Sequence, residues 1–222
     1  MSDLSPEEDA QARAYRFLKH KLSRCEYRPR ERIYAHKIAD EIEVSRTPVR
    51  EALGRLVHEG LVQKEGGWGY SVRALSAQEI RDLYSVRMAL EVEAARAALD
   101  RIGTAELARI DKLLALSAKH LEKSRTADFV ETSRSIHRAI AEASGNRVLI
   151  DLLAGLHERI QVLGFMLNSR NRRRSPQVLQ ENTEMVAALH AKDLERLEQA
   201  IRTHLHNGCA STIEAVREYV TP

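Results

Sequence analysis

The string VSRTPVREAL at residues 44–53 limits the fold of this chain more than any other feature. A short amphipathic segment, IADEI at residues 38–42, precedes it and is broken by a polar turn. Pro48 is tolerated in the first turn of a helix, where a backbone N–H has no intrahelical acceptor in any case. The hydroxyl of Ser45 or Thr47 can accept from the free amides of that turn. The pattern therefore predicts two short helices joined by a turn, which is a helix-turn-helix.

The second of these helices has two distinct faces. Arg46 and Arg50 are four residues apart and share one face, whereas Val49, Leu53 and Leu56 form the opposite face. Guanidinium groups on the exposed first turn of such a helix suit guanine edges or phosphates in a DNA major groove. Surface arginines at the start of an ordinary solvated helix are the alternative, and the flanking elements favour the DNA-binding interpretation.

Two short strands are expected after this helix, at residues 61–65 and 70–73, around the GGWG string at 66–69. Glycine adopts positive φ at little steric cost and lets the backbone approach a phosphate or a minor groove closely. A glycine hairpin alone indicates only a turn. After a helix of the recognition type, it predicts a winged helix-turn-helix domain, which we place at residues 10–74.

Basic side chains are concentrated in the same region. Residues 10–73 contain 14 lysines and arginines against 8 acidic residues, whereas residues 74–222 contain 21 against 20. The formal net charge of the chain is only +3, which is not the profile of a non-specific nucleic-acid coat. The local surplus is what phosphate binding by the winged helix requires.

The remainder of the chain, residues 76–220, has a helical pattern with few glycines and aromatic residues. Ser76 and Glu79 have the spacing of a capping box at the start of the first helix. Long Leu, Ala and Val stripes with short connections predict an antiparallel bundle of about six helices, so the fold class is mostly α. The expected helices are 76–101, 104–123, 128–145, 148–168, 177–190 and 193–219, with Thr104, Asp128 and Asp193 at helix starts and an arginine-rich loop at 169–176.

The winged-helix region closely resembles the GntR family of bacterial transcription regulators. The SRTPVREAL string, the EGLV that follows it and the glycine wing occur in family order, and the resemblance runs from about Tyr15 to Val72. Relatives often have arginine at position 36, so a phosphate contact from His36 is weaker or pH-sensitive in this chain. The resemblance implies DNA contacts at Arg46, Thr47 and Arg50, with Ser45, His36 and Gly67 as supporting contacts.

The second domain resembles the ligand-sensing FCD-type domain of the FadR-like branch of the same family. The strings VRMALEVEAARAA at 86–98, HRAIAEASGN at 137–146 and MVAALHAKDLERLEQAIRTHL at 185–205 carry this resemblance. It implies an all-helical domain that binds an effector and dimerises.

Many members of that branch hold a divalent metal in this domain with one Asp or Asn and three His. The corresponding positions here are Ser133, His137, Asn182 and His204, so only His137 and His204 match. A hydroxyl and a carboxamide supply neither an anion nor a strong nitrogen donor. We therefore expect no cofactor and no tightly held zinc or nickel.

A small-molecule effector remains compatible with these residues. Arg87 lies on the stripe of Leu83, Val86 and Leu90, and a guanidinium that points toward a core needs an anionic partner. That partner is either Glu91, one turn later, or the carboxylate of an effector bound bidentately. Core histidines with no ligand role are a further alternative. The candidate effector-binding residues are Arg87, Ser133, Arg134, His137, Asn182 and His204.

The leading hypothesis is a sequence-specific transcription regulator that binds an inverted-repeat operator as a homodimer, under control of a small carboxylate metabolite. One alternative is a constitutive DNA-binding regulator whose helical domain only dimerises. A metal-dependent enzyme that uses His137 and His204 is the other, although the chain has no nucleophile–base spacing, phosphate loop or HExxH motif. The expected partners are double-stranded DNA, the effector and a second copy of the chain.

The start of the chain and its hydropathy bear on location. The first ten residues are acidic and lack the apolar core of a signal peptide. No apolar run approaches membrane-spanning length. We therefore expect a cytoplasmic protein with no membrane partner.

Overall fold

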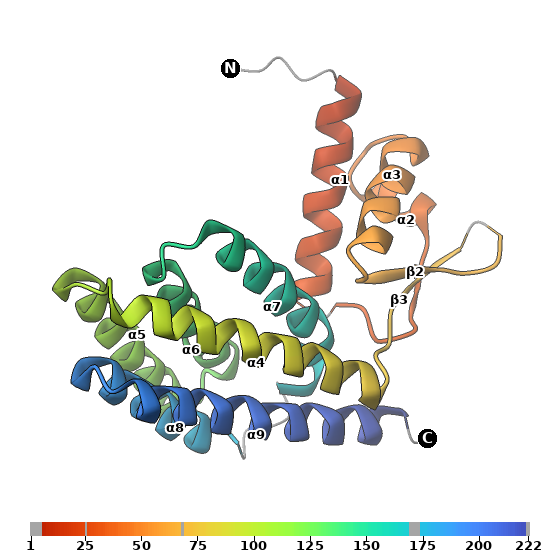
Figure 1. Cartoon of the computed structure of the whole chain (residues 1–222). Coiled ribbons are helices and arrows are strands. Elements are labelled where there is room, and N and C mark those ends of the chain that lie inside the picture. The colour runs from red at the N-terminus through yellow and green to blue at the C-terminus, as the bar shows by residue number, and fades with distance from the viewer. Residues whose placement is uncertain (1–5, 25, 68, 169–173, 221–222) are drawn as a thin grey trace. The chain divides into compact units, whose positions relative to one another are not determined.

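The computed structural model comprises the whole chain and describes residues 6–24, 26–67, 69–168 and 174–220 (Figure 1). The chain packs as two compact units. The first contains the residues up to Leu75 together with 158–166, and the second contains 76–157 together with the residues from 167 onward.

The first unit combines helices with a small antiparallel sheet. Its elements in chain order are α1 (Pro6–Ser23), β1 (Arg32–Ile33), α2 (Ala35–Glu41), α3 (Arg46–His58), β2 (Val62–Lys64) and β3 (Tyr70–Val72). The central strand is β3, where Tyr70 lies opposite both Ile33 of β1 and Lys64 of β2. The predicted helix-turn-helix is thus α2 and α3, and the predicted hairpin is β2 and β3.

Apolar positions of α1 and α3 form the core of this unit. Leu18 and Leu22 of α1 and Leu53 and Leu56 of α3 are at most 1% exposed, and Val49 is fully buried. Burial of one leucine side chain is worth roughly 1.5–3 kcal/mol, so these contacts fix the rotation of α3 about its axis. The predicted inner face of the second helix is confirmed.

The turn between α2 and α3 has an unusual backbone and a distant partner. Glu43 has a φ of 54°, in the left-handed region, which costs a non-glycine residue about 1 kcal/mol. Arg13 of α1 donates from Nη2 to the carbonyl oxygens of Ile42 at 3.1 Å and Glu43 at 3.4 Å. Carbonyls at a helix end lack intrahelical donors, so Arg13 satisfies two acceptors and holds the turn that directs α3.

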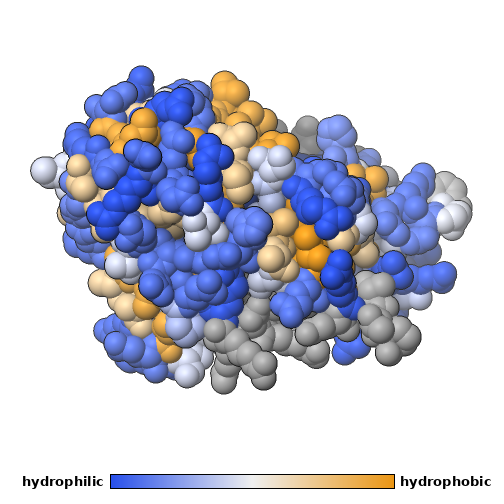
Figure 2. Space-filling view, turned by 60° about the horizontal axis from the view of Figure 1, so that its bottom comes forward, coloured by the Kyte–Doolittle hydropathy of each residue, from blue (hydrophilic) through white to orange (hydrophobic). Residues whose placement is uncertain are grey.

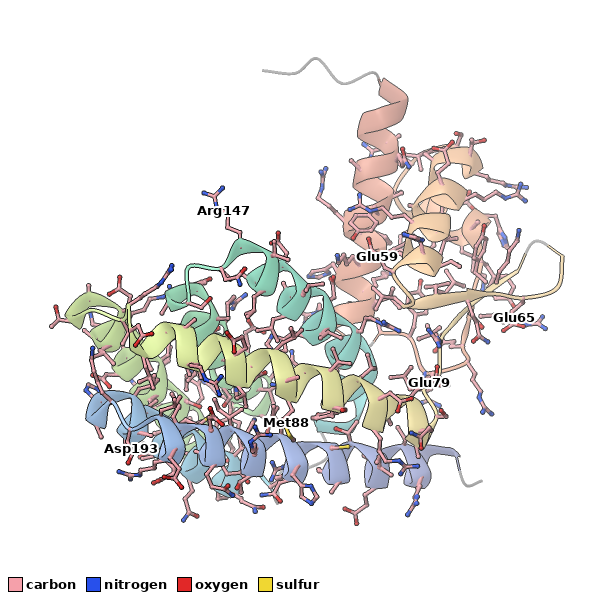
Figure 3. All side chains as sticks on the ribbon, viewed as in Figure 1. Glu59, Glu65, Glu79, Met88, Arg147 and Asp193 are labelled. Atoms are coloured by element: carbon pink, nitrogen blue, oxygen red, sulfur yellow. The ribbon has the colours of Figure 1, made fainter. Side chains whose placement is uncertain are left out.

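A second polar contact joins α1 to the end of α3. Tyr15 donates its Oη hydrogen to the carboxylate of Glu59, with distances of 2.7 Å to Oε1 and 2.9 Å to Oε2. Glu59 is the residue that ends α3 (Figure 3). Burial, and then the hydrogen bond to Glu59, raise the pKa of Tyr15 to about 12. The phenol is therefore protonated at neutral pH and serves as a fixed donor.

The second unit is helical. Within the described ranges its elements are α4 (Ala77–Leu99), α5 (Thr104–Glu122), α6 (Thr126–Ala143), α7 (Arg147–Asn168), α8 (Ser175–Ala191) and α9 (Leu194–Val220). They correspond one by one to the six helices expected, so the predicted fold class, mostly α with a winged helix and a helical bundle, is confirmed. Ile110, Ile136, Met185, Leu189 and Leu197 are each fully buried and form part of the bundle core.

Several helix starts differ from the expectation. Gly103, rather than Thr104, is the N-cap of α5, because its amide donates to the Glu106 carboxylate at 3.1 Å. The third bundle helix begins at Thr126, earlier than Asp128. The capping box of Ser76 and Glu79 at α4 is present as predicted.

The predicted arginine-rich loop is shorter than expected, because α8 already begins at Ser175. Residues 169–173 of that loop, like Trp68 of the wing, lie outside the described residues. The face drawn in Figure 2 is mostly hydrophilic, with smaller hydrophobic areas. Among the described residues, no helix has the length and apolar character needed to cross a membrane.

Candidate functional sites

The residues expected to contact DNA lie on the outer side of the helix-turn-helix. Ser45, Arg46 and Thr47 are exposed, whereas Pro48 and Val49 are buried beneath them. Arg50, one turn further, is half-buried. The N-terminal turn of α3 therefore presents its polar side chains outward.

One detail of this turn corrects the sequence expectation. Ser45 occupies the N-cap position, but no side-chain capping hydrogen bond is made at the start of α3. Neither Ser45 nor Thr47 therefore caps the helix through its hydroxyl. The amides at this end keep their partial positive charge, which favours an anion such as a phosphate.

The two remaining DNA candidates lie on neighbouring elements. His36 of α2 is exposed and its ring centroid lies 5.8 Å from that of Tyr34. Gly67 is exposed in the connection between β2 and β3 with a φ of 76°, and a β-carbon there would meet no atom of the described residues within 4 Å. The hairpin base is closed by a hydrogen bond of 3.0 Å from the Glu65 amide to the Gly69 carbonyl. Gly67 is thus free of packing against the described residues of its own unit.

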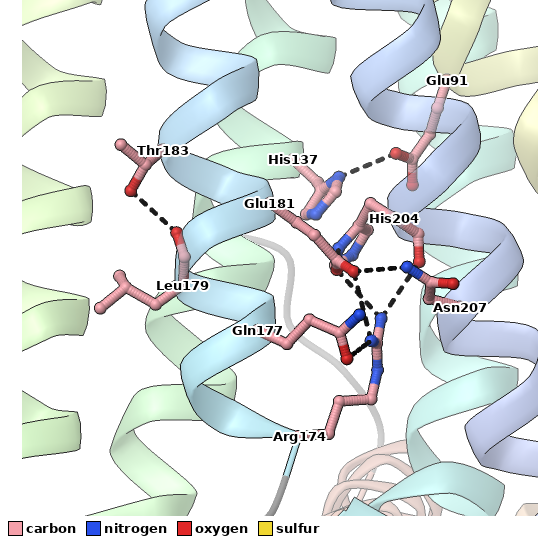
Figure 4. Close-up of polar contacts among 9 residues, drawn as sticks. All are labelled: Glu91, His137, Arg174, Gln177, Leu179, Glu181, Thr183, His204 and Asn207. Carbon is pink, nitrogen blue, oxygen red and sulfur yellow. Dashed lines mark hydrogen bonds and ion pairs between the residues drawn. The ribbon is translucent and has the colours of Figure 1, made fainter.

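The second unit contains a buried polar cluster, which we define as Arg87, Glu91, His137, His157, Glu181 and His204. Glu91 of α4 accepts three hydrogen bonds. Arg87 donates from Nε to Oε1 at 2.6 Å, and the Nε2 atom of His157 lies 2.9 Å from the same oxygen. The Nδ1 atom of His137 lies 2.8 Å from Oε2 (Figure 4).

Glu181 of α8 is the other carboxylate of the cluster. The Nδ1 atom of His204 lies 2.8 Å from Oε2 of Glu181, and Asn207 donates to Oε1 at 2.7 Å. Arg174 contacts both carboxylate oxygens, at 3.3 and 3.0 Å (Figure 4). The rings of His137 and His204 have centroids 4.7 Å apart, which brings the two halves of the cluster together.

The charges of the cluster follow from its hydrogen bonds. Burial alone would raise the pKa of Glu91, but the attraction of Arg87 and His137 and the hydrogen bonds from His137 and His157 hold it well below its usual range. Burial lowers the pKa of His204 to about 4, although Glu181 opposes this shift. Burial also lowers the pKa of His157, with Arg87 acting in the same direction. Glu91 is therefore ionised at neutral pH, and His157 and His204 are neutral.

The structure thus brings together three of the six predicted effector residues, Arg87, His137 and His204. Ser133 is buried, with its Oγ 3.1 Å from that of Ser117. Asn182 is 0% exposed, and neither atom of its amide has a hydrogen-bond partner among the residues that the structure describes. Arg134 is partly exposed and lies 3.9 Å from Glu131.

Sequence reasoning missed His157 and Glu181. His157 follows Leu149 and Leu153 at a spacing of four residues, and this buried stripe of α7 was a signal that it points inward. Glu181 had no comparable signal, because its partners lie on α9 and at the start of α8.

The donor set does not fit the metal site implied by the family resemblance. Of the four corresponding positions, Ser133 is engaged with Ser117 and Asn182 offers only a carboxamide. In the part of the chain that the structure describes, no three His, Cys, Asp or Glu side chains are arranged to hold a metal ion. Two imidazoles alone fall short of a four-ligand zinc site.

The chain combines a helix-turn-helix and a β-hairpin wing with a helical bundle that contains a buried polar cluster. This combination is typical of a winged-helix DNA-binding regulator with a sensor domain. The sequence matches the description "Bacterial regulatory proteins, gntR family" over residues 10–72 and "FCD domain" over residues 82–207. The chain belongs to the GntR family of bacterial regulators, in the group that carries an FCD domain. It is accordingly a transcription regulator with a DNA-binding and an effector-binding domain, and not an enzyme.

Individual relatives are similar over nearly the whole chain. An uncharacterised regulator of Bacillus subtilis (strain 168), YdhC, is 26% identical over 196 residues, which cover 88% of this chain and 87% of the relative. The transcriptional repressor RspR of Escherichia coli (strain K12) is 23% identical over 218 residues, covering 98% and 94%. The solved structure of E. coli McbR/YncC has a TM-score of 0.80 at 23% identity and covers 95% of this chain and 98% of that one. At this identity, the structural likeness shows the fold alone.

Proposed function

We propose that this regulator binds an inverted-repeat operator as a homodimer and responds to a small carboxylate metabolite. Residues 10–74 read DNA, and residues 76–220 bind the effector and dimerise. The protein acts in the cytoplasm, where its operator DNA is.

The outward face of α3 supports specific DNA reading. Arg46 and Thr47 are exposed and Arg50 lies one turn later, while the opposite face is anchored in the core. Arginine binds guanine bidentately in the major groove, and each such contact contributes about 1–3 kcal/mol of discrimination. Ser45, His36 and Gly67 serve as supporting contacts to the phosphate backbone.

The hydrogen bonding of Arg87 is the observation that carries the effector proposal. Its Nε atom is bound to Glu91, whereas its two terminal nitrogens make no hydrogen bond to any residue that the structure describes. Side-by-side N–H groups on a buried guanidinium match a carboxylate. Glu91 therefore neutralises Arg87 without using its bidentate end, which stays available to an acid. Ser133, Arg134, His137, Asn182 and His204 are the further candidates for contact with the effector.

Exposed apolar side chains on α4 and α7 support dimerisation through the second unit. Val86 is 52% exposed, Val148 70% and Leu152 53%. Both helices also contribute buried side chains to one small apolar cluster, Ala94 from α4 and Leu149 from α7. Light scattering should give twice the mass of the 25.2 kDa chain at micromolar concentration.

A charge placed among the exposed apolar side chains of α4 and α7 should weaken the dimer. Leu152→Glu should shift the protein toward the monomer, whereas Leu116→Glu, at a 43% exposed position on α5, should leave the dimer intact. A monomeric wild type across the working range, or equal effects of both variants, would contradict the proposed interface.

The complete proposal is tested by selecting DNA fragments on the purified protein and then titrating small organic acids into the complex. Inverted repeats among the selected fragments, and an acid that changes their affinity in wild type but not in Arg87→Met, are the expected results. Ligand control requires that the acid binds the DNA-competent and incompetent states with different affinity. If no acid changes DNA affinity, the constitutive alternative, in which Glu91 is the sole partner of Arg87, replaces this proposal.

A further inference from the structure

An exposed tyrosine stands at the start of the helix-turn-helix. Tyr34 lies between β1 and α2, at the N-cap position of α2, and is 45% exposed. Among the described residues it is the only exposed large hydrophobic side chain of the first unit. A single exposed aromatic residue is common on protein surfaces, so the meaning of Tyr34 depends on its neighbours.

Two neighbouring side chains of α2 gather on the ring of Tyr34. The Nζ atom of Lys37 lies over the ring, 5.1 Å from its centroid, and the ring centroid of His36 is 5.8 Å away. Both residues are exposed, and Lys37 forms no ion pair with any acidic side chain in the described ranges. The attraction between a cation and an aromatic face holds the ammonium group in place at the surface. We call Tyr34, His36 and Lys37 the Tyr34 cluster.

The register of the sheet brings the Tyr34 cluster beside the wing. Ile33, the last residue of β1, lies opposite Tyr70, the first residue of β3. Tyr34 follows with an extended backbone, at φ −100° and ψ 107°, so the same antiparallel register continues toward Gly69. Gly69 belongs to the connection between β2 and β3, which also contains the exposed Gly67. The Tyr34 cluster and the wing connection therefore share one end of the sheet.

The chemistry of the cluster suits a phosphate. Lys37 covers one face of the Tyr34 ring, so that face is not available for stacking on a base or on an apolar partner. The groups directed to solvent are a phenol hydroxyl and an ammonium, and both are common donors to phosphate oxygens in protein–DNA complexes. In helix-turn-helix proteins the first helix crosses the DNA backbone while the second enters the major groove. The Tyr34 cluster stands at the start of that first helix.

We propose that Tyr34 and Lys37 form a backbone contact of this regulator with DNA. The Tyr34 hydroxyl donates to a phosphate oxygen, and the Lys37 ammonium neutralises the charge of the phosphate. This inference rests on the DNA binding proposed above and adds two residues to its contacts. Since every base pair has the same phosphates, the contact raises affinity for all DNA sequences and leaves the choice of operator to α3.

The salt dependence of DNA binding tests the role of Lys37. Each neutralised phosphate contributes about 0.9 to the slope of log affinity against log salt, which corresponds to about eightfold in affinity between 1 M and 0.1 M salt. Lys37→Met should lower the slope by about one, equally for a selected operator and an unrelated duplex, whereas Lys37→Arg should keep it. Lys112→Met, at an exposed lysine of α5 in the second unit, is the matched control and should also keep the slope. An unchanged slope in Lys37→Met overturns the assignment.

Removing a single hydroxyl tests the role of Tyr34. Tyr34→Phe keeps the ring beneath Lys37 and removes only the donor, so the thermal midpoint should stay the same. Affinity should fall about two- to tenfold on both the operator and the unrelated duplex, and the ratio of the two affinities should not change. Tyr27→Phe, at a half-buried tyrosine of the same unit, should bind as the wild type. Wild-type affinity of Tyr34→Phe would mean that the ring only packs against Lys37, and it overturns the assignment.

Ethylation of DNA phosphates locates the contact on the wild-type protein. Ethylation removes the charge of one phosphate, so interference should appear at a backbone position outside the bases that α3 reads. That position should lose its interference in the double variant Tyr34→Phe, Lys37→Met, and the other positions should keep theirs. An interference pattern equal to that of the wild type overturns this assignment and leaves operator binding by α3 standing. If the wild type binds no selected fragment specifically, the proposed function fails and this inference fails with it.

Discussion

Replacing Arg13 tests whether α1 sets the direction of the recognition helix. Arg13→Met removes the hydrogen bonds to Ile42 and Glu43 but keeps a long side chain that favours helix. The Arg13 side chain is exposed, so the two bonds together are worth about 1 kcal/mol rather than the larger value of a buried charged bond. That energy is similar to the cost of the left-handed conformation at Glu43.

The loss should appear as weaker operator binding. A loss of about 1 kcal/mol changes the equilibrium between the competent and incompetent turn about fivefold, so specific affinity, which follows the competent fraction, falls by at most about fivefold. Gel-shift titrations on a selected operator measure this change. The secondary structure, followed by circular dichroism, should be unchanged at the assay temperature.

Arg16→Met is the matched control for this experiment. Arg16 lies one turn further along α1, is exposed and carries the same charge, but none of the described residues binds its guanidinium. Equal losses for Arg13→Met and Arg16→Met would mean that charge alone matters and would refute the positioning argument. In a Glu43→Gly background, where the turn is unstrained, the effect of Arg13→Met should shrink.

Three further changes test other parts of the structure. Arg46→Ala or Arg50→Ala should each weaken specific DNA binding by about 1–3 kcal/mol, measured by gel shift. Unchanged affinity of the double variant would contradict the assignment of α3 as the recognition helix. Ser133→Asp combined with Asn182→His should create tight zinc or nickel binding, because the double variant has four ligands. Stoichiometric metal in the dialysed wild-type protein, measured by elemental analysis, would contradict the conclusion that its donor set does not fit a metal. The pKa of Tyr15 is about 12 in the folded protein, above its ordinary value of 10.0, so the protonated phenol stabilises the folded state. This stabilisation is complete below pH 10 and is lost as the pH rises through about 12. Alkaline unfolding followed by circular dichroism should lose this component in Tyr15→Phe, and an unchanged profile would contradict it.

The amphipathic patterns predicted the helices because burial is periodic. The inner face of α3 follows from the spacing of Val49, Leu53 and Leu56, and all three are buried as that spacing requires. The Arg87–Glu91 pair was also predictable, since residues four apart on a helix are neighbours.

Helix starts and long-range polar contacts were harder to predict. Ser45 stands where a capping residue belongs, yet its hydroxyl makes no cap, because sequence gives residue type but not side-chain rotamer. Glu181 and His204 lie on different helices, and periodicity shows which side of a helix is buried but not which neighbour covers it. The candidate site was therefore predicted as separate residues, and its hydrogen-bonded connections came only from the structure.

The hydrogen bonds of Glu91 limit how this protein can change during evolution. The carboxylate lies among donors from α4, α6 and α7, so replacing Glu91 alone leaves Arg87 as a buried cation without its counter-ion. Breaking one side of such a buried pair costs about 3–5 kcal/mol, a large share of the stability of a typical domain. Descendants that lose Glu91 must lose Arg87 at nearly the same time, so positions 87 and 91 should be inherited as a pair of charges or as a pair of uncharged residues.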